Sequence, residues 1–207
     1  MKITRIANAG VLVWLDGISV SLDGVCNEFP PYLGTPEAIR RELVKNPPDI
    51  FAVTHFHPDH SDDEFFSGFA RENCRILLAP GYERTGSAGT VTVSAVETRH
   101  IGKSDIPHAS YVINGSRRVW FMGDASPLSL KAFADYPAPH VIIAPYAYAN
   151  TSLSYKNTKN IGADKMVILH LPEEDKDEYG IISAVKECTA GDPSFIFPKI
   201  NETITID

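Results

Sequence analysis

Cysteine is scarce in this sequence. The 207 residues include only Cys26, Cys74 and Cys188, an odd number with no CxxC pair and no clustered spacing. A disulfide framework in a small extracellular domain needs an even set of paired cysteines. We therefore expect three reduced thiols with structural roles, which is typical of a cytoplasmic protein.

Long apolar runs and an excess of basic residues are also missing. No segment approaches the length that crosses a bilayer, and Met1–Ile6 leads into a strand-like pattern without the apolar core of a signal peptide. The net charge is −7. Because binding along a nucleic acid needs a basic stripe, we expect no nucleic-acid partner and no membrane association. A small substrate, even an anionic one, is still compatible with this charge, because bound metal ions dominate the potential in their own cleft.

The composition is that of a globular protein with a core. Apolar residues make up 43% of the chain and charged residues 22%, both ordinary values. The length suits one domain, or one domain made of two similar halves. With no linker or low-complexity tract visible, we expect a single domain over residues 1–207. The sequence does not indicate an oligomeric state.

Short apolar or alternating runs predict strands in two groups, each followed by helices. Asp16-Gly17 and Asn114-Gly115 each separate two such runs and are typical of tight hairpin turns. The predicted strands are Ile3–Ala7, Val11–Leu15, Ile18–Leu22, Ile50–Thr54, Ile76–Ala79, Thr90–Val96, Tyr111–Ile113, Arg117–Met122, Val141–Ala144, Met166–Leu169 and Thr203–Ile206. The first predicted helix has Thr35 as its N-cap. The other predicted helices cover Asp63–Asn73, Leu128–Tyr136 and Glu173–Cys188, and a less regular stretch runs from Tyr146 to Gly162. This order predicts an α/β (α+β) fold in which two sheets pack face to face with helices outside.

Histidine and aspartate residues gather just past the predicted strands. They are His55, His57, Asp59 and His60 after one strand, and His100, Asp124 and His170 after three later ones. Strand ends on one edge of a sheet can converge, so we expect these residues to form one pocket. Three histidines and an aspartate within six residues would be costly to bury without a partner. Imidazole and carboxylate suit zinc, and also manganese or iron.

The spacing of these residues resembles that of the metallo-β-lactamase superfamily. The matching run is His55-x-His57-x-Asp59-His60, then His100, Gly123-Asp124 and His170, and Ser21-Leu22-Asp23 is similar to the family's buried aspartate. The short chain is most similar to the ascorbate-6-phosphate-lactonase-like branch of small metal-dependent hydrolases. The resemblance covers nearly the whole chain and implies a four-layer αββα sandwich.

The resemblance also implies a binuclear centre of two divalent ions, with zinc expected first. His55, His57 and His100 would hold one ion, Asp59, His60 and His170 the other, Asp124 would bridge them, and Asp23 would support the ligands from behind. A hydroxide shared by the two ions would attack an ester, lactone or phosphodiester bond of a small substrate. Asp59 would be the catalytic residue that orients this nucleophile.

Several alternatives stay open from the sequence. His108 also resembles the third histidine motif; we prefer His100 because it closes the strand Thr90–Val96, which leaves His108 lining the pocket or exposed. Arg99, Lys103, Tyr146 and Tyr148 are the other candidates for substrate contact. A single-iron enzyme of thiol redox chemistry and a non-catalytic metal-binding scaffold are the alternative functions.

Two positions narrow the activity within the resemblance. Asp124 stands where true zinc β-lactamases commonly have cysteine, so we expect no antibiotic hydrolysis. His57 stands where oxygen-reducing flavo-diiron relatives have glutamate. Asp124 is followed by Ala125-Ser126, where many relatives have threonine, and the sequence does not say what this changes.

Overall fold

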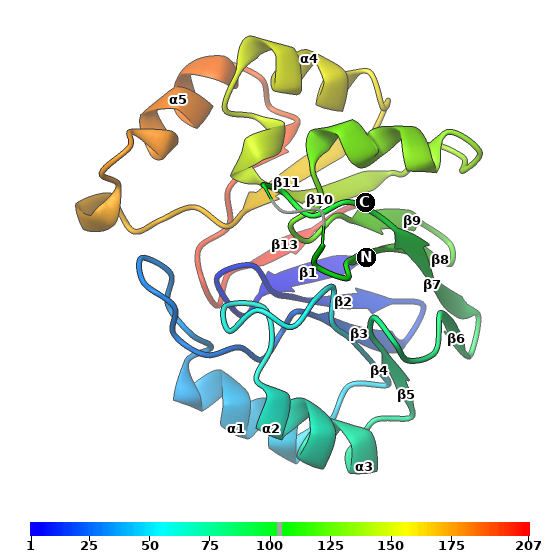
Figure 1. Ribbon diagram of the computed structural model, residues 1–207. Coiled ribbons are helices and arrows are strands. Elements are labelled where there is room, and N and C mark those ends of the chain that lie inside the picture. The colour runs from blue at the N-terminus through cyan, green and yellow to red at the C-terminus, as the bar shows by residue number, and fades with distance from the viewer. Residues whose placement is uncertain (103–104) are drawn as a thin grey trace.

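The strands form two sheets in the computed structural model, which describes residues 1–102 and 105–207 (Figure 1). Six strands run in the order β13-β1-β2-β3-β4-β5, and seven in the order β12-β11-β10-β9-β8-β7-β6. The bounds are β1 Lys2–Arg5, β2 Val11–Leu15, β3 Ile18–Leu22, β4 Ile50–Ala52, β5 Ile76–Leu78, β6 Thr85–Ala88, β7 Val91–Glu97, β8 Ala109–Asn114, β9 Arg118–Phe121, β10 Val141–Pro145, β11 Lys165–Leu169, β12 Phe195–Ile196 and β13 Thr203–Thr205.

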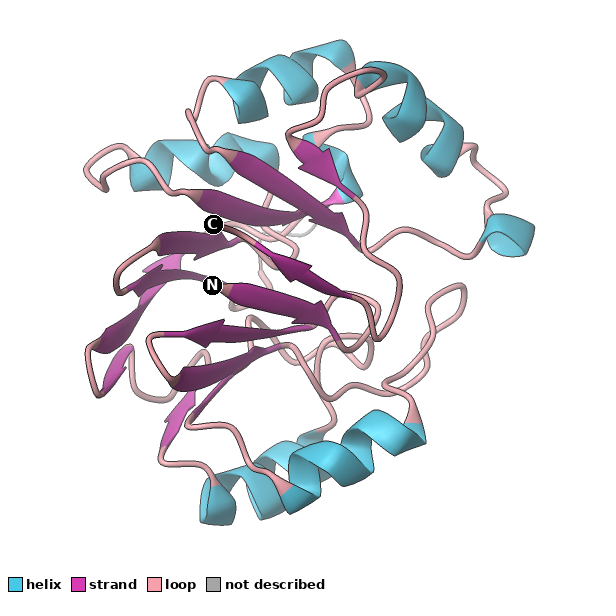
Figure 2. Ribbon diagram, turned by 180° about the vertical axis from the view of Figure 1, so that it is seen from behind, coloured by secondary structure: helices cyan, strands magenta, loops and turns pink. Residues whose placement is uncertain are grey.

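Helices cover the outer face of each sheet. They are α1 Glu37–Lys45, α2 Asp63–Phe65, α3 Arg71–Asn73, α4 Ser152–Lys159 and α5 Ile181–Cys188, with a π-helical turn η1 Phe66–Ala70 and the 3-10 helices η2 Pro127–Phe133, η3 Tyr146–Tyr148 and η4 Glu174–Lys176. Figure 1 shows α1 to α3 below the first sheet and α4 and α5 above the second, and Figure 2 shows the same layers from behind. The predicted αββα sandwich is therefore confirmed.

The buried runs pack on both of their faces. In β9, Val119 and Phe121 belong to the core between the two sheets, whereas Trp120 between them packs with the outer core under Phe133. Successive side chains of a strand point to opposite faces, so a continuous apolar run is needed wherever both faces are covered. This is why the central strands lack the alternating pattern of a half-exposed sheet.

The predicted helix starts are the least accurate part of the sequence interpretation. Thr35 does not cap α1: its hydroxyl donates to the Gly24 carbonyl at 3.1 Å and accepts from the Cys26 N–H at 2.9 Å, and Pro36 takes the N-cap position. The stretch expected to be irregular contains α4, which begins with a reciprocal cap between Thr151 and Ser154.

The predicted helix Glu173–Cys188 is also wrong as a single element. It is divided into η4 and α5 at Gly180, whose φ is +64°. The carboxylate of Asp177 accepts from the N–H groups of Ile181 and Ile182 at 2.8 Å each, which provides partners for free donors at the start of α5. The short edge strands β6 and β12 were not predicted.

Parallel pairing brings the polar residues together. β3, β4 and β5 are parallel to one another, and so are β9, β10, β11 and β12. Their carboxyl ends therefore lie at one edge of each sheet, where ligand sites of open α/β sheets are found. The segments after β3, β4, β9 and β11 carry Asp23, His55–His60, Asp124 and His170. Among the described residues, no helix is both long and apolar enough to cross a membrane.

Candidate metal centre

The loop after β4 folds tightly on itself. The carbonyl of His57 accepts from the N–H groups of His60 at 3.0 Å and Ser61 at 2.8 Å. This turn brings both ends of the histidine run to one place, and the rings of His55 and His60 lie 4.2 Å apart. Residues only five apart in the chain can therefore contribute to neighbouring sites.

The first group of possible ligands is His55, His57 and His100. Nε2 of His55 lies 3.0 Å from Nδ1 of His57 and 3.2 Å from Nε2 of His100. Nδ1 of His100 donates to the carbonyl of Ile101 at 2.5 Å, so its Nε2 carries a lone pair. Three ring nitrogens this close cannot all find donors among themselves, and a shared cation resolves the conflict.

The second group is Asp59, His60 and His170. The Nε2 atoms of His60 and His170 are buried and make no hydrogen bond within the described part of the chain. Nε2 of His170 lies 3.2 Å from Oδ2 of Asp59. Buried nitrogens without a hydrogen-bond partner are rare in folded proteins and call for an explanation. A bound cation between these three side chains supplies one.

Asp124 lies between the two groups. Its Oδ1 is 3.4 Å from Nε2 of His60 and 3.5 Å from Nε2 of His170, whereas its Oδ2 is 3.7 Å from Nε2 of His100. One carboxylate oxygen thus faces each group. His55, His60 and Asp124 also form a third set whose ligand atoms lie within 4.8 Å of one another, which joins the two groups into one centre.

Asp23 orients the ligands from behind. Its carboxylate is fully buried and accepts from Nδ1 of His60 at 2.8 Å, and from the N–H and hydroxyl of Thr54 at 2.7 Å each. Because the Thr54 hydroxyl donates its only proton to Asp23, it accepts from Nδ1 of His55 at 3.0 Å. Both His55 and His60 are thereby fixed with Nε2 toward the centre.

Two residues of the centre have strained backbones. Asp23 has φ +47° and His170 has φ +60°, in the left-handed region that favours glycine. Such strain costs on the order of 1–3 kcal/mol per residue and is concentrated at functional sites. The fold therefore keeps these two side chains in place at some cost in stability.

The electrostatics of the centre favour a cation. Burial lowers the pKa of His55 well below its ordinary value, so this imidazole is neutral, the form that binds metal. Burial also opposes the charged form of His60, but the carboxylates of Asp124 and Asp23 hold the pKa of His60 well above its ordinary value. A divalent cation in the place of that proton satisfies the same carboxylates, so the residues present fit divalent metal ions.

Tyr148 is not placed to contact a substrate, contrary to expectation, whereas His108 lines a cavity of about 560 Å³. His108 is buried, with Nδ1 2.8 Å from the Thr98 hydroxyl and Nε2 accepting from the Asp124 N–H at 3.1 Å. Tyr148 has no exposed surface, and its hydroxyl donates to the Ser126 carbonyl at 3.3 Å. Both residues also hold the segment around Asp124. Lys103 lies outside the described residues.

Two tyrosines lie beside the centre. Tyr146, one of the expected contacts, is half-buried with its ring 6.4 Å from that of His170. Tyr32 was not predicted, yet its ring packs edge-on against His170 at 4.1 Å. It belongs to a Pro/Gly-rich segment far from every ligand motif in the sequence, so no sequence signal points to it.

Comparison with known proteins gives similarity in structure only. No protein-family profile and no curated protein sequence matches the chain. Solved structures that are similar include a possible metal-dependent hydrolase from Veillonella parvula, with TM-score 0.71, 16% identity and coverage of 100% of this chain and 99% of that one. An isothiocyanate hydrolase from Delia radicum gut bacteria has TM-score 0.64, 14% identity and coverage of 99% of both chains.

A third similar structure carries the name of the fold. It is the metallo-β-lactamase fold protein YhfI from Bacillus subtilis, with TM-score 0.60, 16% identity and coverage of 98% of both chains. Identities this low show the arrangement of the chain and leave the activity to be argued from the site. The two helix-covered sheets, with a histidine and aspartate centre at their edge, have the metallo-β-lactamase fold.

Proposed function

We propose that this protein is a hydrolase that uses two divalent metal ions, zinc first among them, to cleave an ester, lactone or phosphodiester bond in a small substrate. The position of Asp124 carries the proposal, because its two oxygens face two separate groups of ligands. Paired divalent ions, when bound, supply hydroxide at neutral pH and polarise the bond that breaks.

The chain's own residues would position the reactants. The pKa of Asp59 is lowered: burial opposes this, but the closeness of His170, whose Nε2 lies 3.2 Å from Oδ2 of Asp59, and of His60 outweighs it. Asp59 is therefore an ionised acceptor at neutral pH, able to hold a proton of the attacking water and so orient its lone pair. Its Oδ2, 3.2 Å from Nε2 of His170, lies within the second group of ligands.

The substrate would approach from the exposed side of the centre. His57 is half-exposed and the Asp124 side chain is 17% exposed, whereas His55 and His60 have no exposed surface. A reacting bond placed over Asp124 would face both groups of ligands. The buried side, held by Asp23, excludes water and fixes the ligand geometry.

The alternative functions explain less of the site. A single iron would occupy only one of the two groups of ligands. If it occupied the first group, the Nε2 atoms of His60 and His170 would stay buried without a partner among the described residues. A scaffold without turnover would not need the partial exposure of His57 and Asp124, through which a substrate can reach the centre. Two groups that share one carboxylate can hold two ions close together, which is what two-metal hydrolysis requires.

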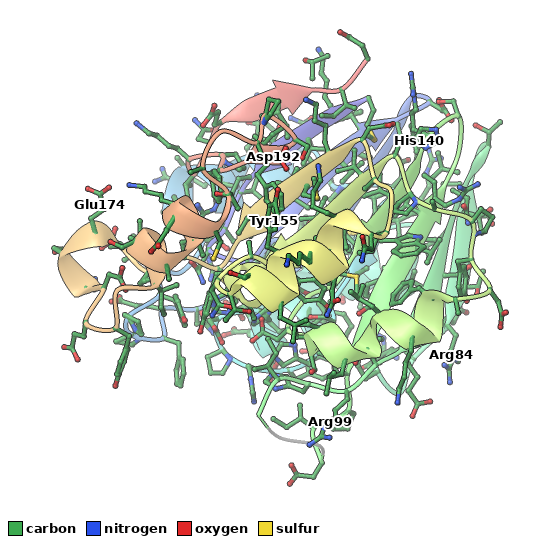
Figure 3. All side chains as sticks on the ribbon, turned by 90° about the horizontal axis from the view of Figure 1, so that it is seen from above. Arg84, Arg99, His140, Tyr155, Glu174 and Asp192 are labelled. Atoms are coloured by element: carbon green, nitrogen blue, oxygen red, sulfur yellow. The ribbon has the colours of Figure 1, made fainter. Side chains whose placement is uncertain are left out.

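A matched pair of histidine variants tests the proposal. His57→Ala removes a ligand of the first group, and His140→Ala removes the one histidine outside the centre. His140 precedes β10 and so lies at the opposite sheet edge, and Figure 3 shows it on the opposite side of the molecule from Glu174. Metal per chain is measured by elemental analysis, and turnover with a panel of p-nitrophenyl esters, lactones and bis-p-nitrophenyl phosphate.

We expect His57→Ala to lose metal and turnover, and His140→Ala to keep both. Full turnover by a metal-free His57→Ala protein would refute the proposal. One iron per chain in the wild type, without hydrolysis of any panel member, would instead support the redox alternative.

A further inference from the structure

A cleft opens directly beside His170. Its volume is about 560 Å³, and Tyr32 and Tyr146 both line it. The same two tyrosines pack against the His170 ring, Tyr32 edge-on at 4.1 Å and Tyr146 at 6.4 Å. None of the candidate metal ligands lines the cleft, so these two tyrosines are what connects it to the centre. Its size is that of sites for small organic ligands.

Two loops from opposite halves of the sandwich form the cleft. Pro30 and Pro31 come from the loop after β3, whereas Pro172 and Tyr179 come from the segment between β11 and α5, and Ile181 begins α5. Figures 1 and 2 both show these loops facing each other at one side of the molecule. Tyr179, at the mouth, is 87% exposed. Prolines, tyrosines and an isoleucine give walls that suit an apolar group.

The charges at the mouth are acidic. Asp175 and Glu178 line the cleft, and neither is in an ion pair within residues 1–102 and 105–207. Lys176 is the one basic residue in the lining, and it is paired with Glu173 at 3.1 Å. Asp177 already accepts hydrogen bonds from the start of α5. A phosphate or carboxylate entering here meets like charge and finds no free cation among the residues that line the cleft.

We infer that this cleft selects substrates that carry an uncharged aromatic or branched-alkyl group and rejects anionic ones. The inference rests on the proposed function and narrows it to neutral esters and lactones, with phosphorylated lactones and phosphodiesters disfavoured. It adds Tyr32 and Tyr146 as specificity-determining residues, and Asp175 and Glu178 as the charges that exclude anions.

A second cavity provides a matched control. It also has a volume of about 560 Å³, and Tyr82 and Arg84 line it. Tyr82 packs on Phe66 and is 47% exposed. As in the proposed cleft, none of the seven candidate metal ligands lines this cavity, but Tyr82 packs on Phe66, whereas Tyr32 and Tyr146 pack against a ligand. Tyr82→Ala therefore removes the same side chain as Tyr146→Ala from a cavity of equal size without touching the proposed cleft.

Binding is measured first, because it does not depend on turnover. Calorimetry with the metal-loaded protein compares phenylbutanol, phenylbutylammonium and phenylbutanesulfonate, which share one apolar group and differ in charge. We expect the alcohol to bind about tenfold more tightly than the sulfonate, a difference of about 1.4 kcal/mol. Tyr146→Ala should weaken alcohol binding several-fold, whereas Tyr82→Ala should leave it unchanged.

A charge reversal tests the exclusion of anions. Asp175→Lys combined with Glu178→Lys should remove most of the discrimination against the sulfonate. The control is Glu37→Lys with Glu42→Lys on α1, which makes the same change in net charge on the opposite helix layer. If both double variants reduce the discrimination against the sulfonate equally, the net charge of the protein causes this discrimination and the cleft does not, which overturns this part of the inference.

Kinetic measurements distinguish a failure of this inference from a failure of the proposed function. Kinetics compare p-nitrophenyl phenylpropanoate, which is uncharged, with mono-p-nitrophenyl succinate, which is anionic. We expect kcat/KM to favour the uncharged ester in the wild type and to lose that preference in Asp175→Lys/Glu178→Lys. Equal binding of alcohol and sulfonate, or equal effects of Tyr146→Ala and Tyr82→Ala, overturns the inference even if esters are hydrolysed. Selective binding without any hydrolysis overturns the proposed function alone.

Discussion

Nδ1 of His60 donates to Oδ2 of Asp23 at 2.8 Å, and this bond determines which nitrogen of His60 faces the centre. Through the hydroxyl of Thr54, the same carboxylate also fixes His55. A single buried residue thereby orients one ligand from each group. Partners of this kind behind the ligands typically change metal affinity by about 10- to 100-fold.

Replacing Asp23 by asparagine should therefore weaken metal binding. The variant keeps the shape of the side chain but loses the charge and half of the acceptor capacity, so the orientation of His55 and His60 is lost. We expect metal affinity to fall by about 10- to 100-fold in a chelator competition titration.

Asp49→Asn is the matched control for this change. Asp49 immediately precedes β4, at the other end of the strand, and accepts from the N–H and hydroxyl of Ser19 at 3.0 and 2.9 Å. Its replacement should cost stability without changing metal affinity. An equal loss of metal in both variants would show that the effect of Asp23 comes from general destabilisation.

His108 should behave as a support of Asp124 and not as a ligand. His108→Ala leaves the N–H of Asp124 without its partner, a loss of about 1–3 kcal/mol in the free energy of unfolding. Metal content at saturating zinc should stay at the wild-type level, whereas His100→Ala should lose an ion. Elemental analysis and urea denaturation of both variants check this assignment. Loss of an ion from His108→Ala with retention in His100→Ala would reverse it.

Gly123 must be a glycine for two independent reasons. Its φ is +54°, and a Cβ at this position would lie 2.6 Å from the side chain of Thr54. Gly123→Ala should therefore destabilise the fold by more than the ~1–3 kcal/mol of backbone strain alone. It should also reduce metal affinity, because Thr54 moves away from Asp23. Gly162→Ala shares the positive φ but has no neighbour within 4 Å, so it should show the strain alone. Urea unfolding curves of the two variants give the comparison.

Zinc should stabilise the folded chain. A ligand that binds only the folded state at 100 times its dissociation constant adds about 2.7 kcal/mol to the free energy of unfolding. The melting temperature should therefore rise with added zinc and fall with chelator in the wild type and in His140→Ala. His57→Ala should respond much less. A shift of equal size in His57→Ala would place the stabilising zinc elsewhere.

The layers and most of the central strands could be predicted because the residue pattern that produces each of them lies within a short segment of the sequence. A strand buried on both faces needs a short continuous apolar run, and Ile50–Ala52 and Val141–Pro145 lie within or next to runs of that kind. The convergence of the candidate ligands could be predicted because each follows such a run, and the resemblance supplied their order. Asp23 was proposed from the resemblance alone.

What the sequence could not supply depends on contacts between distant segments. Tyr32 reaches His170 across 138 positions, from a segment with no motif of its own. Tyr148 was a candidate for substrate contact because it lies near predicted ligands, but packing places it in the outer core. The helix start at Thr35 failed because its hydroxyl is used by Gly24 and Cys26, a tertiary contact that outweighs the capping preference.

Reconstitution of the metal-free protein tests the central claim most directly. Zinc is added back stepwise after chelation, and hydrolysis of a neutral p-nitrophenyl ester is measured together with zinc bound per chain. Because Asp124 faces two groups of ligands, we predict that hydrolysis returns only as the second ion binds and reaches its maximum at two per chain. Full activity with one ion per chain, or with none, would contradict the account.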